Sequence, residues 1–257
     1  MNTLVFDIET IPDVELGRAI YGIDDLSDAD VAKVMRFKHK QSRGTDFLPH
    51  PQHRIVAISV VLRSADELHV FSIGDAQSGE QELIRRFFDG LERYVPELVS
   101  WNGSGFDLPV LHYRAMRHFV TAEKYWDIGD DDRDFRFNNY LGRFHWRHID
   151  LMDVIAGYQP GARSSLEQVA LLMGFPGKLG MSGDKVWDKY QSGLIDEIRN
   201  YCETDVLNTY LVYLRFQLMR GLLDRQRHDA EVRLLRDKLA GEQADHLQEF
   251  LAAWQVG

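Results

Sequence analysis

The first hydrophobic run of the chain, residues 3–8, sets the strongest limit on the fold. Its β-branched and aromatic residues, TLVFDI, predict a strand that is buried on both faces. We expect two further strands over residues 55–62 and 68–73, and another over 98–101. Apolar residues at helical spacing over 79–94 predict a helix between them. Strands followed by strands that alternate with helices predict an α/β domain around a mixed sheet.

The segments between these elements are less regular. Residues 13–54 form an expected insertion whose charge is divided, with −5 over residues 11–30 and +5 over 33–54. Such a stretch is commonly a solvated insertion, and a basic arm beside a substrate groove is the alternative. A second insertion is expected near 119–148. Further helices are expected over four segments: 106–118, 165–173, 194–219 and 222–254.

The formal net charge of −10 limits the possible partners. A protein that coats a nucleic-acid duplex needs a surface rich in Lys and Arg, so this class is excluded, whereas an enzyme that holds only a nucleic-acid end is not. The single cysteine, Cys202, allows no intramolecular disulfide and suits a reducing compartment. Neither an export signal nor a bilayer-long apolar run is evident, so we expect a soluble cytoplasmic protein.

Two acidic residues close the first strand. Asp7 and Glu9 are two positions apart, so in a strand their carboxylates point to the same face. Paired carboxylates suit Mg²⁺ or Mn²⁺, which prefer oxygen ligands. The same spacing recurs at residues 13–15 and 229–231, but no buried-strand pattern precedes it there. The strand context therefore distinguishes Asp7 and Glu9.

Two more acidic motifs follow along the chain. Residues 102–107, NGSGFD, lie where a strand meets a helix, and an ordinary helix cap would also explain the acid at Asp107. Tyr201 and Asp205 are four positions apart in a helix and share a face. For Tyr201 the alternative is a core aromatic on an amphipathic helix. Each motif alone is weak evidence for a catalytic site. The order of the three motifs along the chain is the stronger evidence.

In that order the three motifs resemble those of the DEDD superfamily of 3′–5′ exonucleases, in its tyrosine-bearing branch. The histidine branch has a His five residues before the last Asp, where this chain has Asn200. The resemblance covers residues 3–219. Residues 177–180 (GKLG) and 201–210 (YCETDVLNTY) resemble in particular the stand-alone predicted exonucleases related to the proofreading domain of family-B DNA polymerases. From a length of about 250 residues we expect no polymerase domain.

The resemblance implies a ribonuclease H-like fold, which is a five-stranded mixed sheet flanked by helices with the second strand antiparallel. It implies an exonuclease domain over residues 1–220, with insertions near 13–54 and 119–148. Residues 221–257 are then a C-terminal helical extension. The extension is either an oligomerisation element or a cover for the sheet, and the oligomeric state stays open.

The resemblance also implies roles for individual residues. Asp7, Glu9, Asp107 and Asp205 match the family's metal-binding acids, and Tyr201 matches its water-orienting tyrosine. Four converging carboxylates would repel one another, and two divalent cations, Mg²⁺ or Mn²⁺, would cancel their charge. The family pattern places four more residues near the terminal nucleotide, although core packing explains the last of them equally well: Thr10, Ile11, Asn102 and Phe106.

We therefore expect a two-metal 3′–5′ exonuclease that releases nucleoside 5′-monophosphates from a nucleic-acid 3′ end, with single-stranded or frayed DNA favoured over RNA. One alternative is a nucleic-acid-binding module on the same fold that has lost catalysis. Another is a phosphohydrolase that acts on free nucleotides. Metal-dependent shortening of a labelled strand distinguishes all three.

Several polar residues outside these motifs have ordinary explanations. The H-x-x-H pairs at 50–53 and 145–148 lack the thiolates of typical structural zinc sites, so we expect them at the surface or beside the substrate. Asp150 is expected to cap a helix, with an extra acid near the metals as the alternative. Residues 140–147 are expected to be a folded loop rather than a stacking platform for single strands. Cys202 is expected to be a packing residue.

Overall fold

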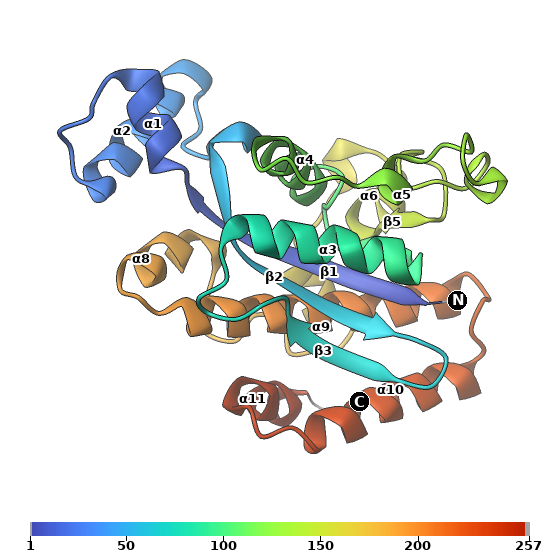
Figure 1. Ribbon diagram of the computed structural model, residues 1–257. Coiled ribbons are helices and arrows are strands. Elements are labelled where there is room, and N and C mark those ends of the chain that lie inside the picture. The colour runs from blue at the N-terminus through green and yellow to red at the C-terminus, as the bar shows by residue number, and fades with distance from the viewer. Residues whose placement is uncertain (1, 255–257) are drawn as a thin grey trace.

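The computed structural model describes residues 2–254, which fold around one five-stranded sheet (Figure 1). Its strands are β1 (Thr3–Pro12), β2 (His53–Arg63), β3 (Leu68–Ser72), β4 (Glu97–Ser100) and β5 (His148–Asp150). Its helices are α1 (Val14–Tyr21), α2 (Asp28–Arg43), α3 (Glu80–Tyr94), α4 (Asp107–Arg117), α5 (Glu123–Trp126), α6 (Leu151–Ile155), α7 (Leu166–Leu172), α8 (Val186–Gln191), α9 (Ile195–Met219), α10 (Arg225–Ala240) and α11 (Asp245–Ala253).

The strand order is β3-β2-β1-β4-β5. Strand β2 runs antiparallel to both of its neighbours, whereas β1, β4 and β5 run parallel to one another. The predicted mixed sheet with an antiparallel second strand is therefore confirmed. Because β1 and β4 are parallel neighbours, the residues that follow β4 lie beside the later part of β1.

Helices cover both faces of the sheet and form two separate cores (Figure 1). Leu4, Phe6 and Ile8 of β1 pack into one core with α3 and α4. Val5 points the other way and packs with α9, α10 and α11. This alternation fits a strand buried on both faces, as its sequence predicts.

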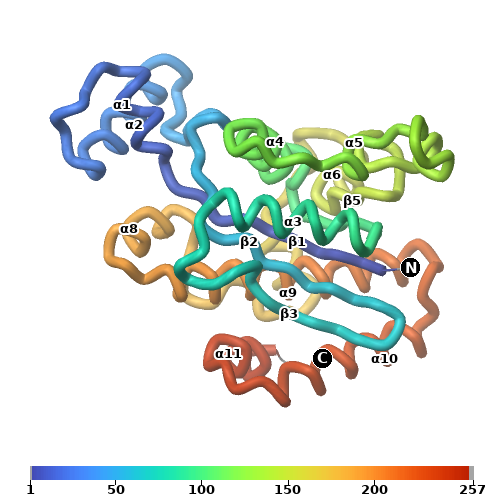
Figure 2. Tube along the Cα trace, in the orientation of Figure 1, coloured from blue at the N-terminus to red at the C-terminus, as the bar shows by residue number. Residues whose placement is uncertain are grey.

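The insertion after β1 contains two helices that its sequence did not predict. Helices α1 and α2 form a hairpin beyond the carboxyl end of β1, near α8 (Figure 2). Asp13 caps α1 by accepting from the Leu16 amide, and Ser27 caps α2. Ala32 of α2 packs with Ile11 of β1 and Trp187 of α8, so the hairpin belongs to the folded unit.

Strand β1 is also longer than predicted. It continues to Pro12, so the D-x-E repeat at residues 13–15 does follow a strand, contrary to the sequence-based expectation. Asp13 is buried and bound to the Arg114 guanidinium at 2.5 Å. Asp13, the first acid of this repeat, therefore has a structural role, because its carboxylate is bound in an ion pair with Arg114 of α4.

The second insertion is a folded loop only in part. Tyr140 is buried and donates from its hydroxyl to the Pro96 carbonyl at 2.8 Å, and Arg147 stacks on the Phe135 ring at 4.0 Å. Phe144 and Trp146, in contrast, are 70% and 42% exposed, so only part of this run packs into the core.

Helices α10 and α11 pack against α9 and cover part of the sheet (Figure 1). Four of their residues are fully or nearly fully buried in the core that contains Val5: Leu235, Leu239, Leu247 and Phe250. The domain boundary near residue 220 stays a prediction. Among residues 2–254, no helix combines the length and apolar character that a bilayer crossing requires.

Candidate active site

Asp7 and Glu9 lie on the face of β1 that is turned toward α9. Val5, two residues earlier, packs in the core with α9, so alternation brings the next two odd-numbered side chains to the same side. The thiol of Cys202 on α9 lies 3.6 Å from Asp7 Oδ2. Asp7, Glu9 and Cys202 each offer one possible ligand atom, and these atoms lie within 4.8 Å of one another.

Asp107 reaches this place from the other neighbour of β1. It is the first residue of α4, directly after the turn that follows β4, and it is buried. Its Oδ1 accepts a hydrogen bond from the Ile8 amide at 3.2 Å, which lies between Asp7 and Glu9 in the chain. The carboxylate of Asp107 is thereby fixed against the backbone of β1.

Helix α9 supplies the remaining acid. Asp205 and Tyr201 are buried one turn apart, and the oxygen Asp205 Oδ1 has no hydrogen-bond partner in the structure of residues 2–254. A buried carboxylate oxygen without a donor is costly, because desolvation is not repaid by any protein contact. Asp205 thus has one coordination position free for a cation.

Burial raises the pKa of all four acids, and for Asp7 and Glu9 the neighbouring carboxylates raise it further. Desolvation and then the charges of Asp107, Glu9 and Asp205 raise the pKa of Asp7, and desolvation and the same kind of repulsion raise that of Glu9. Burial raises the pKa of Asp107 to about 7, against the hydrogen bonds from backbone amides. Burial raises the pKa of Asp205 to about 6, against the effect of Tyr201. These four groups therefore resist carrying four negative charges at once.

Lys178 is a site residue that the sequence did not identify. It lies in the glycine-rich segment before α8, and its ammonium stands 5.6 Å from the centre of the Tyr201 ring. Its charge lowers the pKa of both Glu9 and Asp205. In the sequence, residues 177–180 (GKLG) indicated only the family resemblance. The lysine within this segment could also have been predicted as a site residue.

The residues fit a divalent metal ion with oxygen ligands. Four carboxylates with raised pKa values and one orphaned oxygen match the preference of Mg²⁺ and Mn²⁺ for oxygen ligands. Burial and the neighbouring carboxylates raise the pKa of the Cys202 thiol, so it stays protonated and is a poor metal ligand. Cys202 is fully buried, as expected for a packing residue, and its thiol also donates to the Asp7 carboxylate.

A groove opens beside the acids. Glu9, Thr10, Ile11 and Phe106 line it, with a volume of about 420 Å³. His53 also lines the groove and makes two hydrogen bonds. Its Nε2 donates to the Leu48 carbonyl at 3.0 Å. In the neutral ring Nδ1 is then the acceptor, and it accepts from the Thr10 hydroxyl at 2.8 Å. Three of the four predicted substrate-binding residues therefore share one groove next to the predicted metal ligands.

Asn102, the fourth, lies apart from this groove, in the turn after β4. It adopts a left-handed conformation with φ of 66°, which Asn tolerates better than most residues. A side chain at Gly105 would collide with Asn102, since its Cβ would come within 2.4 Å of Asn102 Oδ1. Asn102 thus shapes the turn that leads into Asp107.

Asp150 holds the same turn from β5. Its carboxylate accepts from the backbone amides of Asn102 and Ser104, both at 2.9 Å, and from Asp153 at the start of α6. The predicted helix-capping role is confirmed. The charge of Asp150 also helps raise the pKa of Asp107. Asp150 therefore lies close to a predicted metal ligand, as the alternative of an extra acid near the metals implies.

A buried ion cluster holds α4 against β1 and α3. Arg114 binds Asp13 with one nitrogen and Glu80 with two, and Glu80 also binds His118 at 2.7 Å. The arginine and both carboxylates have side chains no more than 5% exposed. Because Asp107 begins the helix that carries Arg114, this cluster positions a predicted metal ligand from two turns away.

A protein-family model matches residues 45–254 of the chain and describes a predicted 3′–5′ exonuclease related to the exonuclease domain of PolB. The matched segment contains the turn after β4, α4 and α9. It does not include Asp7 and Glu9 on β1, which precede residue 45.

Two curated relatives are DNA polymerases. One from Archaeoglobus fulgidus is 27% identical over 169 residues, which are 64% of this chain and 20% of the relative. DNA polymerase 1 of Sulfurisphaera ohwakuensis is 41% identical over 73 residues, 28% of this chain and 7% of the relative. The chain thus matches a fifth or less of the length of each relative.

Among solved structures, the family B DNA polymerase of the archaeon Pyrobaculum calidifontis aligns with 99% of this chain and 27% of its own. The TM-score is 0.49 and the sequence identity is 18%.

Proposed function

We infer the reaction from the premise that the chain belongs to the family of predicted 3′–5′ exonucleases related to the exonuclease domain of PolB. It is accordingly an enzyme with a nucleic-acid substrate. We propose that it uses the tyrosine-type DEDD chemistry. One observation carries this proposal: Asp107 of α4 and Asp205 of α9 lie close enough to Asp7 and Glu9 of β1 to raise their pKa values, and Asp205 Oδ1 has no hydrogen-bond partner among residues 2–254.

Asp7, Glu9, Asp107 and Asp205 would hold two divalent cations, Mg²⁺ or Mn²⁺. Bound there, the cations supply positive charge that lowers the pKa of an attacking water and stabilises the departing 3′-oxygen. The protein fixes the ligands in advance. The Ile8 amide holds Asp107, and the Cys202 thiol lies beside Asp7.

Tyr201 orients the attacking water as a hydrogen-bond partner. Burial and the surrounding carboxylates raise the pKa of its phenol above the ordinary value, so the hydroxyl keeps its proton at neutral pH and is no general base. Lys178, beside the ring, places a positive charge where the scissile phosphate would lie. Water adds to phosphorus, the bond to the 3′-oxygen breaks, and a nucleoside 5′-monophosphate leaves.

The groove beside Glu9 suits the 3′-terminal nucleotide. Ile11 and Phe106 offer apolar surface for a sugar or a base, and Thr10, whose hydroxyl bonds to His53, lines the same groove. We propose DNA as the favoured strand over RNA, with single-stranded or frayed 3′ ends preferred, because the relatives it matches are DNA polymerases.

A time course on end-labelled strands tests the proposal. Single-stranded DNA with a 5′ label should shorten one nucleotide at a time in Mg²⁺ or Mn²⁺, a 3′ label should be released at once as the 5′-monophosphate, and EDTA should stop both. The Asp205→Ala variant should lose activity because it removes the unpaired oxygen.

Two outcomes would contradict the proposal. Binding of the strand without any shortening would favour a module that has lost catalysis. Hydrolysis of free nucleotides without strand shortening would favour a phosphohydrolase. The same time course on RNA strands of equal sequence measures the preference between DNA and RNA.

A further inference from the structure

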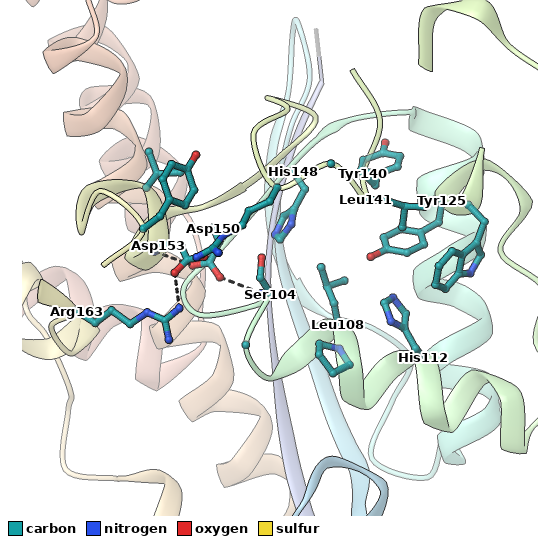
Figure 3. Close-up of a pocket in the computed structure, with 17 residues that line it drawn as sticks. Ser104, Leu108, His112, Tyr125, Tyr140, Leu141, His148, Asp150, Asp153 and Arg163 are labelled. Carbon is teal, nitrogen blue, oxygen red and sulfur yellow. Dashed lines mark hydrogen bonds and ion pairs between the residues drawn. The ribbon is translucent and has the colours of Figure 1, made fainter. Parts of the chain in front are cut away.

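A second cavity lies across the turn 102–107 from the groove. It has a volume of about 490 Å³, within the ~300–1,000 Å³ of typical ligand sites. Phe106 lines the groove, whereas Ser104 and Gly105 of the same turn line this cavity. Figure 3 shows side chains from α4, α5, β5 and α6 pointing into it. Neither the proposed metal ligands nor the proposed terminal-nucleotide residues account for this space.

One end of the cavity carries two arginines, Arg143 and Arg163, beside two aspartates, Asp150 and Asp153. Arg143 and Arg163 both bind Asp153, at 3.0 and 2.5 Å, so two guanidinium groups share one carboxylate (Figure 3). The neighbouring Asp150 is engaged by three backbone amides. Each guanidinium has five N–H donors, and the pairing with Asp153 leaves most of them free. This end suits a phosphate group.

The other end is aromatic. His112, Tyr125 and Trp126 form a triangle of rings, with centroids 4.9 to 5.3 Å apart. Burial lowers the pKa of His112 to about 4, so the ring is neutral, and its Nε2 is buried with no hydrogen-bond partner in the structure of residues 2–254. Trp126 is 52% exposed. A nucleobase matches both features, since it offers a π face and ring-edge donors and acceptors.

We propose that this cavity binds an internal nucleotide of the substrate strand, with the base at Trp126 and His112 and a phosphate at Arg163 and Arg143. The inference rests on the proposed function and adds a second subsite to it. A polynucleotide places aromatic and anionic groups in alternation, and the cavity presents matching groups at its two ends.

Continuity with the acid cluster favours the strand over a free nucleotide as the occupant. The turn between groove and cavity leads directly into Asp107, and Asp150 binds that turn while also lining the cavity. A strand that passes over this turn from its 3′ end would enter the cavity with a following nucleotide. Occupation would then set the position of the scissile bond as well as the affinity.

The test compares Arg163→Met with Arg85→Met, a matched control. Arg163→Met leaves Asp153 paired with Arg143, and Arg85 is an exposed arginine on α3 outside the cavity. Two readouts are needed: binding of a labelled octanucleotide in Ca²⁺ by fluorescence anisotropy, and hydrolysis in Mg²⁺. Hydrolysis is measured on the octanucleotide and on thymidine 5′-monophosphate p-nitrophenyl ester, which has no internal nucleotide.

Arg163→Met should weaken octanucleotide binding about tenfold, as expected for loss of a charge-assisted phosphate contact. Its kcat/KM on the octanucleotide, relative to that on the ester, should fall by a similar factor, through KM. Trp126→Leu should lower the same ratio, whereas Arg85→Met should change neither readout.

Equal loss on both substrates, or no loss in binding, would overturn the proposal. Tight binding of free thymidine 5′-monophosphate that Arg163→Met abolishes without affecting the octanucleotide would assign the cavity to a free nucleotide and also overturn it. If the wild type binds strands but cleaves none, the proposed function fails while the binding comparison still decides the subsite.

Discussion

At the scale of single residues, the charge on Asp7 is the clearest conflict between stability and the proposed chemistry. The unfolded carboxyls have lower pKa values than the folded ones, so the folded state binds more protons and its free energy of unfolding falls as pH rises. The fall extends through the folded pKa values of about 6 for Asp205 and about 7 for Asp107. Above those values the carboxyls of Asp205 and Asp107 carry their negative charges.

Buried histidines act in the opposite sense at lower pH. Burial lowers the pKa of His53, His112 and His148 to about 4, so their contribution to stability grows as pH rises from about 4 to 6.5 and is then constant. The effect of the carboxylates is therefore best isolated between pH 7 and 8.5.

Asp7→Asn should stabilise the metal-free protein in that window. Removing one of four repelling charges should raise the melting temperature in EDTA at pH 8 by about 2–4 °C, the shift that ~1 kcal/mol gives a chain of this size. Mg²⁺ should raise the melting temperature of the wild type, because it binds the folded state, and should not raise that of the variant. A variant less stable than the wild type in EDTA would contradict mutual repulsion at this site.

Tyr201→Phe should lower kcat about 100- to 1,000-fold, the range for losing one oriented hydrogen-bond donor in the transition state. The stabilisation by Mg²⁺ should persist, since Tyr201 is not among the proposed ligands. Single-turnover kinetics and thermal melts check the two halves separately. A kcat equal to that of the wild type would remove the water-orienting role.

The sequence correctly predicted which site residues share a face when this depends only on the period of a strand or a helix. Asp7 and Glu9 share a face because strands alternate, and Tyr201 and Asp205 share one because helices repeat every 3.6 residues. Lys178 and Cys202 could not be assigned in this way, because their approach to the acids depends on how a loop and a helix pack on β1.

At the scale of elements, the position of α4 depends on a buried ion cluster. Arg114→Met should destabilise the protein by about 3–5 kcal/mol, because Asp13 and Glu80 would stay buried without their partner. Urea unfolding measures this, and Arg85→Met, which breaks an exposed pair, should cost less than ~1 kcal/mol. Similar losses in both variants would show that the cluster does not hold α4.

The same cluster explains why the sequence missed part of the fold. Asp13, Glu80 and Arg114 are charged residues in segments of mixed polarity, and sequence patterns assign such residues to the surface. Helices α1 and α2 were not predicted for a related reason. Helix α2 buries only Val31, Ala32 and Met35, and its other positions are mostly charged or polar. Segments with broad apolar faces, such as α3 and α9, were predicted to within one or two residues.

At the scale of the whole molecule, the C-terminal helices belong to the folding unit. The family match runs to residue 254, and we propose that residues 221–254 complete the core rather than follow it as an appended extension. Deleting residues 221–257 would uncover the part of the core that α10 and α11 close, at a cost of about 1.5–3 kcal/mol for each large apolar side chain lost. Such a sum is comparable to the entire stability of a typical domain.

The truncated chain should therefore be unfolded or aggregated at 37 °C, as circular dichroism and size-exclusion chromatography would show. A monomeric, cooperatively melting fragment of residues 1–220 would contradict this and support an appended extension.

The net charge of −10 has a local explanation at this scale. Four of the formal negative charges belong to Asp7, Glu9, Asp107 and Asp205, whereas the cavity on the other side of the turn pairs two arginines with two aspartates. The molecule is therefore suited to hold the end of one strand and not to coat a duplex.

The central claim is that Asp7, Glu9, Asp107 and Asp205 together hold two catalytic cations. Crystals grown with Mn²⁺ and a nucleoside 5′-monophosphate test it through the anomalous scattering of manganese. We predict two peaks about 3.5–4 Å apart among these four carboxylates, one of them in contact with Asp205 Oδ1. Manganese bound elsewhere, or no peak among the four carboxylates, would contradict the account.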